Sequence, residues 1–194
     1  MQEYYIREMK QSDLKEIYSH IKKDFIPGEY PPFAVLAEQF KTGKFEGYIL
    51  YKDKTDLAYS ICTSDSRNGY VLLSLLAVFP EYRGSGFGTN FVKQLITMYK
   101  DKMSMIVEVE KPETAKESKE RELRLKRIGF YERLGFYLIP GIDYSIWDIS
   151  LHLMAVPLKA SPEDINSRIG DIMYQIYLEL MGQRYMNKMY LKKL

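Results

Sequence analysis

The stretch from Val71 to Thr89, VLLSLLAVFPEYRGSGFGT, constrains the fold of this chain more than any other. Residues 71–78 are almost entirely apolar, a run long enough for a buried strand and too short for a membrane span. Pro80 ends this strand, because proline cannot donate a hydrogen bond to a sheet ladder. Beyond the glycines, apolar residues recur at Phe91 and Leu95, a spacing typical of a helix. The glycines therefore lie on a strand-to-helix turn.

A turn of this kind can bind an anion. The first N–H groups of a helix have no partner within the helix, and the positive end of the helix dipole lies at the same place. Gly84, Gly86 and Gly88 let a pyrophosphate approach the backbone without meeting a Cβ, and Arg83 and the Thr89 hydroxyl can add contacts. A flexible connection is the alternative. The spacing fits neither the ATP-binding loop nor the dinucleotide fingerprint Gly-x-Gly-x-x-Gly.

The pattern Arg-x-x-Gly-x-Gly after a strand resembles the acyl-coenzyme A loop of the GNAT (Gcn5-related) N-acetyltransferase superfamily. A second segment, FYERLGF at residues 130–136, is similar to that superfamily's helix-to-strand segment, which carries a tyrosine beside the thioester. Two motifs in the right order are more specific than one. The resemblance implies acetyl-CoA as co-substrate. The residues that it implies for coenzyme binding are Leu76, Ala77, Val78, Arg83, Gly84, Ser85, Gly86, Phe87, Gly88, Thr89 and Tyr131.

The fold class implied is α/β (α+β). It comprises a mixed, mostly antiparallel sheet of roughly six to seven strands, flanked by helices, with a splayed parallel pair at the fourth and fifth strands. An extra C-terminal helix follows. The residues agree with this order, because residues 46–64 read as two strands joined by a polar hairpin turn that lead into the strand at 71–78. A strand, a helix and another strand at 103–110 then predict the parallel pair.

The composition is that of an ordinary globular protein, with 46% hydrophobic and 28% charged residues. The net charge is only +2, so nothing global draws the chain to nucleic acid or to an anionic membrane. A single cysteine, Cys62, and two histidines make a zinc site improbable, and we expect no metal. No apolar signal core opens the sequence, and a cytoplasmic location is expected.

The segment before the sheet offers candidates for acceptor recognition. Apolar residues at helical spacing from Leu14 to Phe25 predict a first helix, and the proline-rich loop FIPGEYPPF follows at residues 25–33. In the superfamily such a unit shapes the acceptor pocket. Glu29 and Tyr30 are either part of a solvated turn or residues that bind the acceptor amine.

Alternation in residues 103–110 places Glu108 and Glu110 on one face of a strand. Both side chains either reach water past the sheet edge or attract a cationic amine and take its proton.

Downstream, Thr114 and Glu117 predict a capping box for a helix that runs to Leu134. That helix has no apolar face in its first half.

Beyond residue 157 the chain extends past the minimal superfamily. Ser161 and Pro162 begin a helix whose apolar stripe includes Ile165, Ile169 and Ile172. Such a stripe must be covered, either by the chain's own sheet or by a second subunit in a homodimer. We therefore expect a catalytic domain at residues 1–157 and a C-terminal helix and tail at residues 158–194, with a lysine-rich end that frays.

The resemblance also implies a mechanism, direct attack of a neutral amine on the thioester. It gives Tyr131 the protonation of the departing thiolate, and the backbone N–H near Val78 the polarisation of the carbonyl. Some members carry a glutamate base on the fourth strand. The matching segment here, Leu72 to Leu75, has no carboxylate, and Ser74 is its one polar residue. The base is therefore expected to be Glu108 or Glu110, and Glu108 is also a candidate for binding the acceptor.

The acceptor is predicted to be a primary amine of a small molecule or a peptide. Two alternatives stay open. One is a module that binds acyl-CoA as a regulatory ligand and transfers nothing, and the other is an enzyme that acetylates protein N-termini or lysines.

Overall fold

The computed structural model describes residues 4–194, so the first three residues of the predicted catalytic domain lie outside the described part. The chain divides into two compact units. The first comprises the residues up to Ser64 together with Leu73–Met98, and the second comprises Asp65–Leu72 and Tyr99–Leu194. None of the helices within residues 4–194 has the length and apolar character needed to cross a membrane.

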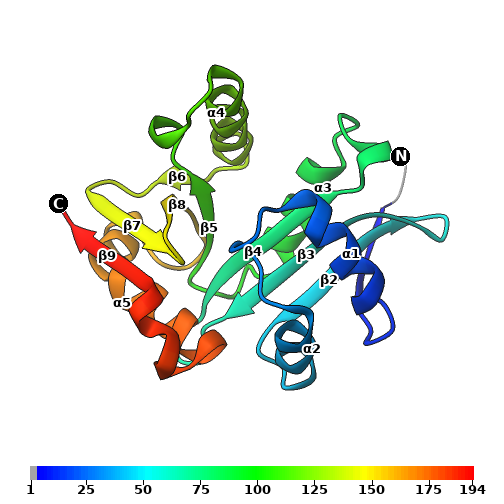
Figure 1. Cartoon of the computed structure of the whole chain (residues 1–194), viewed down its shortest axis with the longest axis horizontal. Coiled ribbons are helices and arrows are strands. Elements are labelled where there is room, and N and C mark those ends of the chain that lie inside the picture. The colour runs from blue at the N-terminus through cyan, green and yellow to red at the C-terminus, as the bar shows by residue number, and fades with distance from the viewer. Residues whose placement is uncertain (1–3) are drawn as a thin grey trace. The chain divides into compact units, whose positions relative to one another are not determined.

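The strands of the first unit follow the order β1, β2, β3 and β4, and β2 pairs antiparallel with both β1 and β3. Figure 1 labels β2, β3 and β4. Tyr5 of β1 lies opposite Tyr51 of β2, and Gly47 of β2 lies opposite Ile61 of β3. Asp53 and Lys54, both with positive φ, form the tight turn between β2 and β3. The strand bounds are β1 Tyr5–Glu8, β2 Glu46–Lys52, β3 Thr55–Ser64 and β4 Tyr70–Val78, of which Leu73–Val78 belongs to this unit.

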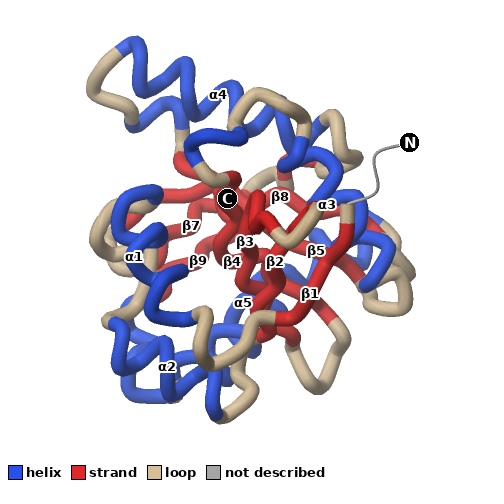
Figure 2. Tube along the Cα trace, turned by 90° about the vertical axis from the view of Figure 1, so that its right-hand side faces the viewer, coloured by secondary structure: helices blue, strands red, loops and turns tan. Residues whose placement is uncertain are grey.

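Three helices complete the first unit: α1 (Leu14–Asp24), α2 (Phe33–Lys41) and α3 (Phe87–Met98). Figure 2 draws them in blue. The predicted apolar face of the first helix is confirmed, because Leu14, Ile17 and Ile21 are buried. These side chains share one core with others from α2, β2, β3 and β4, which include Leu36, Ile49, Tyr59, Ile61 and Leu75.

The second unit has the strand order β4, β5, β8, β7 and β9, with β6 paired to β8. Residues Tyr70–Leu72 of β4 run parallel to Ser104–Ile106 of β5, and the other pairs are antiparallel. A mostly antiparallel sheet with one parallel pair confirms the predicted fold class. The strand bounds are β5 Ser104–Glu110, β6 Tyr137–Leu138, β7 Ile142–Ile146, β8 Ile149–Pro157 and β9 Met189–Lys193.

The helix after β5 starts later than the sequence predicts. A short 3-10 helix, η2 (Pro112–Thr114), precedes α4 (Ser118–Glu132). The Thr114 hydroxyl donates to the Lys111 carbonyl at 3.0 Å and does not cap α4. The predicted capping box is therefore wrong, because Pro112 begins a separate turn that takes up Thr114.

The C-terminal helix, α5 (Pro162–Met181), begins as predicted. The Ser161 hydroxyl accepts a hydrogen bond from the Asp164 amide at 3.1 Å, and Pro162 occupies the first turn. The apolar stripe packs in one cluster with side chains of β5, β7 and β8. Its buried members are Ile165, Ile169, Ile172, Met173, Ile176 and Tyr177.

The lysine-rich end does not fray. After a 3-10 helix, η3 (Gln183–Lys188), the chain forms β9, which pairs with β7 (Figure 1). Tyr190 of β9 lies opposite Ser145 of β7. The prediction of a frayed tail is wrong, because β7 offers an edge whose backbone groups the tail can satisfy. The second unit therefore includes the last residues of the chain in its sheet.

Candidate functional site

The Gly-rich loop, residues 83–89, follows the 3-10 helix η1 (Pro80–Tyr82) in the first unit and includes the first residues of α3. Gly84 and Gly86 both have φ of +80°, a conformation that costs other residues about 1–2 kcal/mol. A Cβ at either position would meet no atom within 4 Å. Glycine is thus required by the backbone conformation, and the space beside it is open.

The backbone donors of this loop are available. The Arg83 amide donates to the Pro80 carbonyl at 3.4 Å, and the first helical hydrogen bond runs from the Asn90 amide to the Gly86 carbonyl at 3.1 Å. In the described part of the chain, the amides of residues 84–89 donate to no other group. Unpaired amides at the positive end of a twelve-residue helix fit a diphosphate.

Arg83 is held by the chain itself. Its guanidinium donates to the Asp24 carboxylate at 2.6 Å and to the Val78 carbonyl at 3.0 Å. The Asp24 side chain is only 7% exposed and also accepts a hydrogen bond from the Tyr59 hydroxyl at 2.9 Å. Burial, and then the charge of Asp24, raise the pKa of Tyr59, which keeps the phenol a donor. No pattern in the sequence pointed to Asp24, which binds Arg83 of the Gly-rich loop from the end of α1.

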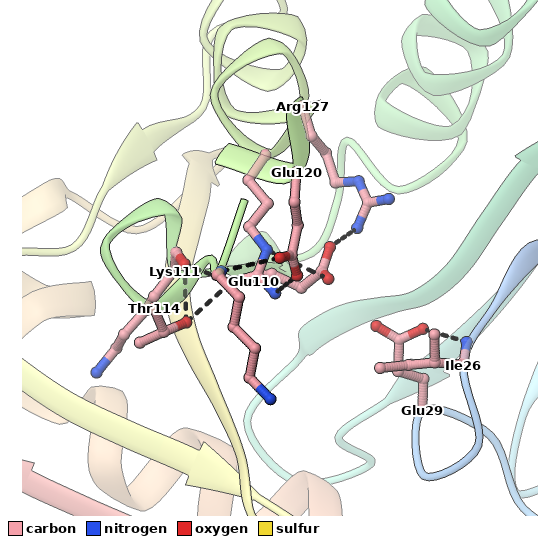
Figure 3. Close-up of polar contacts among 9 residues, drawn as sticks. Ile26, Glu29, Glu110, Lys111, Thr114, Glu120 and Arg127 are labelled. Carbon is pink, nitrogen blue, oxygen red and sulfur yellow. Dashed lines mark hydrogen bonds and ion pairs between the residues drawn. The ribbon is translucent and has the colours of Figure 1, made fainter. Parts of the chain in front are cut away.

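The other predicted coenzyme contacts on β4, Leu76, Ala77 and Val78, are half-buried at the end of the strand. Glu29 and Tyr30 lie in the loop after α1. The Glu29 carboxylate accepts a hydrogen bond from the Ile26 amide at 3.0 Å (Figure 3). The Tyr30 ring packs edge-on against Tyr18 with centroids 5.9 Å apart. Both residues thus help to shape this loop.

In the second unit, Glu110 is part of an ion-pair network (Figure 3). Its carboxylate binds Arg127 at 2.5 Å and lies 3.5 Å from the guanidinium of Arg124. Arg124 also donates to Glu120 and to the Lys111 carbonyl. The sequence predicted that Glu110 either reaches water or serves as a base, and it did not predict these two partners. Arg124 and Arg127 belong to α4, the helix that follows the strand.

Glu108 is also engaged. Its carboxylate accepts hydrogen bonds from the Tyr177 hydroxyl, 2.9 Å from each oxygen, and from the Tyr144 hydroxyl. The expectation that Glu108 simply reaches water past the sheet edge is wrong, because α5 and β7 bring two buried phenols onto it. Neither tyrosine is among the candidate site residues that the sequence indicated.

Tyr131 occupies the last turn of α4 and is 7% exposed. Its ring packs edge-on against Phe130 and Phe136, with centroids 5.0 and 5.2 Å away. The Phe136 amide donates to the Tyr131 carbonyl at 3.1 Å, which closes the helix end. The FYERLGF segment thus forms a compact helix-to-strand corner that fixes the direction of Tyr131.

One of the two histidines of the chain, His152, lies on β8 in this unit. The His152 ring nitrogen Nε2 lies 2.8 Å from the Glu113 carboxylate. Burial opposes ionisation of Glu113, but hydrogen bonds from its own backbone and from His152 outweigh it and lower its pKa. His152 is therefore a partnered sheet residue.

Known proteins are similar to this chain in sequence and in fold. The sequence model of the acetyltransferase (GNAT) domain matches residues 43–138. N-alpha-acetyltransferase 30 of Schizosaccharomyces pombe is 27% identical over 136 residues, which cover 68% of this chain and 75% of that protein.

Two solved structures are similar in fold. One is a putative GNAT-family acetyltransferase from Bacteroides thetaiotaomicron, with a TM-score of 0.74 and 20% identity over 92% of this chain and 98% of that chain. The other is spermidine N-acetyltransferase from Vibrio cholerae in complex with CoA and spermine. It has a TM-score of 0.61 and 12% identity over 80% of this chain and 95% of that chain.

Proposed function

Because the chain belongs to the GNAT superfamily of N-acetyltransferases, we propose that it transfers an acetyl group from acetyl-CoA directly to a primary amine. The observation that carries this proposal is the Gly-rich loop. Its amides at residues 84–89 are unpaired within the described chain, its two glycines have open space beside them, and α3 begins there. These donors suit the diphosphate of the coenzyme. The related fold of a spermidine acetyltransferase solved with CoA supports the same ligand.

Bound coenzyme would supply the activated acetyl thioester, and the side chains of this protein would move the protons. The acceptor is an ammonium ion at neutral pH, so a base must remove one proton before the nitrogen can attack. We assign this step to Glu108, since Glu110 is bound by two arginines. We assign to Tyr131 the proton that converts the leaving thiolate to a thiol. The amide near Val78 would polarise the carbonyl.

The acceptor we propose is a small-molecule or peptide amine, with Glu29, Tyr30 and Glu108 as candidate contacts. A carboxylate attracts an ammonium group, and an aromatic face can bind it by a cation–π interaction. The catalytic part would be residues 1–157. A second candidate is transfer to a protein N-terminus, which is favoured by the similarity to an N-alpha-acetyltransferase.

Calorimetric titration with acetyl-CoA tests the Gly-rich loop. In Gly86→Glu, the new carboxylate would repel the diphosphate, so we expect affinity to fall at least about a hundredfold. The substitution also places a side chain at positive φ. Gly43→Glu is the matched control, because Gly43 has φ of +67° and open space beside it but lies at the end of α2. Equal affinity of the two variants would remove the loop from coenzyme binding.

Release of free coenzyme A, measured against a panel of amines, identifies the acceptor. The panel comprises polyamines, aminoglycosides, amino acids and short peptides with free N-termini. Turnover with a small amine supports the first proposal, and turnover with peptides alone supports the second. Binding of acetyl-CoA without turnover on any of these amines would instead support a regulatory module.

A further inference from the structure

A buried cluster in the second unit combines one carboxylate with two phenols. Glu108 lies on β5, Tyr144 on β7 and Tyr177 on α5. Tyr177 is 2.9 Å from both carboxylate oxygens, and Tyr144 donates to one of them. Three elements distant in the sequence therefore converge on one side chain.

The cluster is arranged to hold an ionised carboxylate. Both phenols are buried, and burial followed by the charge of Glu108 raises their pKa values well above the ordinary one, so both remain proton donors. Donors that face a carboxylate favour its charged form. Across the ladder on β8 lies the apolar residue Leu153. The neighbouring charges on β5 and beyond are paired, Glu110 with Arg124 and Arg127, and Lys111 with Asp143 of β7.

Glu108 remains only partly buried, whereas its two donors are almost completely covered. The phenols thus fix the direction of the carboxylate, and Glu108 as a residue is not fully enclosed. A proton acceptor in a transfer reaction needs this combination of a fixed direction, a maintained charge and access for the proton donor.

We propose that Tyr144 and Tyr177 are positioning residues that hold Glu108 as the base of the acetyl transfer. This inference rests on the proposed function. The acceptor ammonium would lose one proton to the Glu108 carboxylate, which becomes a carboxylic acid, and the resulting neutral amine keeps the electron pair that forms the new C–N bond. The bond that breaks is the thioester C–S bond, and its thiolate takes a proton from Tyr131. The nitrogen of the new amide gives up its second proton, which restores the Tyr131 phenol.

The proposal gives the C-terminal extension a part in the reaction. The matched acetyltransferase domain ends at residue 138, and both tyrosines lie beyond it. Tyr177 is also outside the predicted catalytic part, residues 1–157, because it belongs to α5. The helix thus does more than cover apolar surface: it completes the support of Glu108.

The test is the pH dependence of kcat/KM for Tyr144→Phe and Tyr177→Phe, each with the best amine from the panel. Removing one donor makes the charged carboxylate less favourable, so the acid limb of the profile is expected to move to higher pH. We expect a shift of about one pH unit, which is a tenfold lower kcat/KM on that limb. Acetyl-CoA affinity by calorimetry should stay unchanged. Glu108→Gln should remove the limb.

Tyr174→Phe is the matched control, because Tyr174 is an exposed tyrosine of the same helix. An acid limb at the wild-type pH in both Tyr144→Phe and Tyr177→Phe would overturn the inference. An equal loss of kcat/KM at every pH, together with a lower melting temperature, would also overturn it. Failure of the proposed function is distinct, since it would show as wild-type protein that does not bind acetyl-CoA or does not acetylate any amine.

Discussion

At the residue scale, two glycines and one buried carboxylate organise the Gly-rich loop. Gly84 and Gly86 supply the positive φ angles that turn the chain into α3. Asp24 then fastens Arg83 to the end of α1 through a 2.6 Å contact. Arg83 is still 54% exposed, so it keeps N–H groups that can meet a phosphate. The contact between Arg83 and Asp24 thus holds the loop in place, while the amides of residues 84–89 stay available to a ligand.

Tyr131→Phe tests the proposed proton donor at this scale. The ring contacts with Phe130 and Phe136 remain in the variant, so folding and coenzyme affinity should be preserved. Loss of the phenol proton should lower kcat by about a hundredfold or more. Single-turnover kinetics and calorimetry separate the two quantities. Tyr137→Phe is the control, because that phenol donates to Asn166 and has no assigned role; equal rates for the two variants would end the assignment.

At the element scale, the tight turn between β2 and β3 has an unfavourable sequence. Asp53 and Lys54 have φ of 48° and 67°, the left-handed conformation of both central residues in a type I′ turn. Lysine has a Cβ that disfavours this conformation, whereas glycine at the second position is the usual choice. The paired strands β2 and β3 impose the turn geometry on residues that do not prefer it.

Lys54→Gly should therefore stabilise the protein by about 1 kcal/mol. Denaturant unfolding followed by circular dichroism measures this difference. Lys93→Gly, at an exposed position inside α3, is the matched control and should cost about 1 kcal/mol, because glycine is unfavourable in a helix interior. A loss of stability in Lys54→Gly would contradict the account of the turn.

At the scale of the whole molecule, each unit has its own core and its own polar anchors. In the first unit, Arg7 joins Asp13, which precedes α1, to Asp56 of β3, at 2.6 and 2.8 Å. Burial opposes ionisation of Asp13, but hydrogen bonds from Arg7 and from the Lys10 amide outweigh it and lower its pKa. A carboxylate of this kind makes the stability of the protein depend on pH.

The sign of that dependence follows from linkage. Because the pKa of Asp13 is lower in the folded state, its contribution is present above the unfolded value of about 4 and is lost as pH falls through the folded value. We expect Asp13→Asn to be less stable at pH 7 and to lose less stability on acidification. Thermal unfolding between pH 7 and pH 2 measures both effects. Asp171→Asn, at an exposed position of α5, should retain the wild-type pH dependence.

Much of the fold follows from local patterns in the sequence. The apolar run at residues 71–78 became β4, the spacing of Leu14, Ile17 and Ile21 became the buried face of α1, and Ser161 with Pro162 began α5. The extent of the sheet was less predictable. Strand β9 and the turn at Pro112 depend on which backbone groups a neighbouring segment leaves open, and a local pattern does not contain that information.

The sequence by itself determined the course of the chain from β4 through the Gly-rich turn to α3 and β5, and it showed the resemblance to the GNAT superfamily. Glycine spacing and apolar periodicity are set by backbone sterics and by burial within a few residues. Only the tertiary structure decided the partners of the charged and phenolic side chains. Asp24 meets Arg83, and Glu108 meets Tyr144 and Tyr177, across separations of 59, 36 and 69 residues. Contacts at that distance depend on how whole elements pack, because a hydrogen bond forms only where packing brings donor and acceptor within reach.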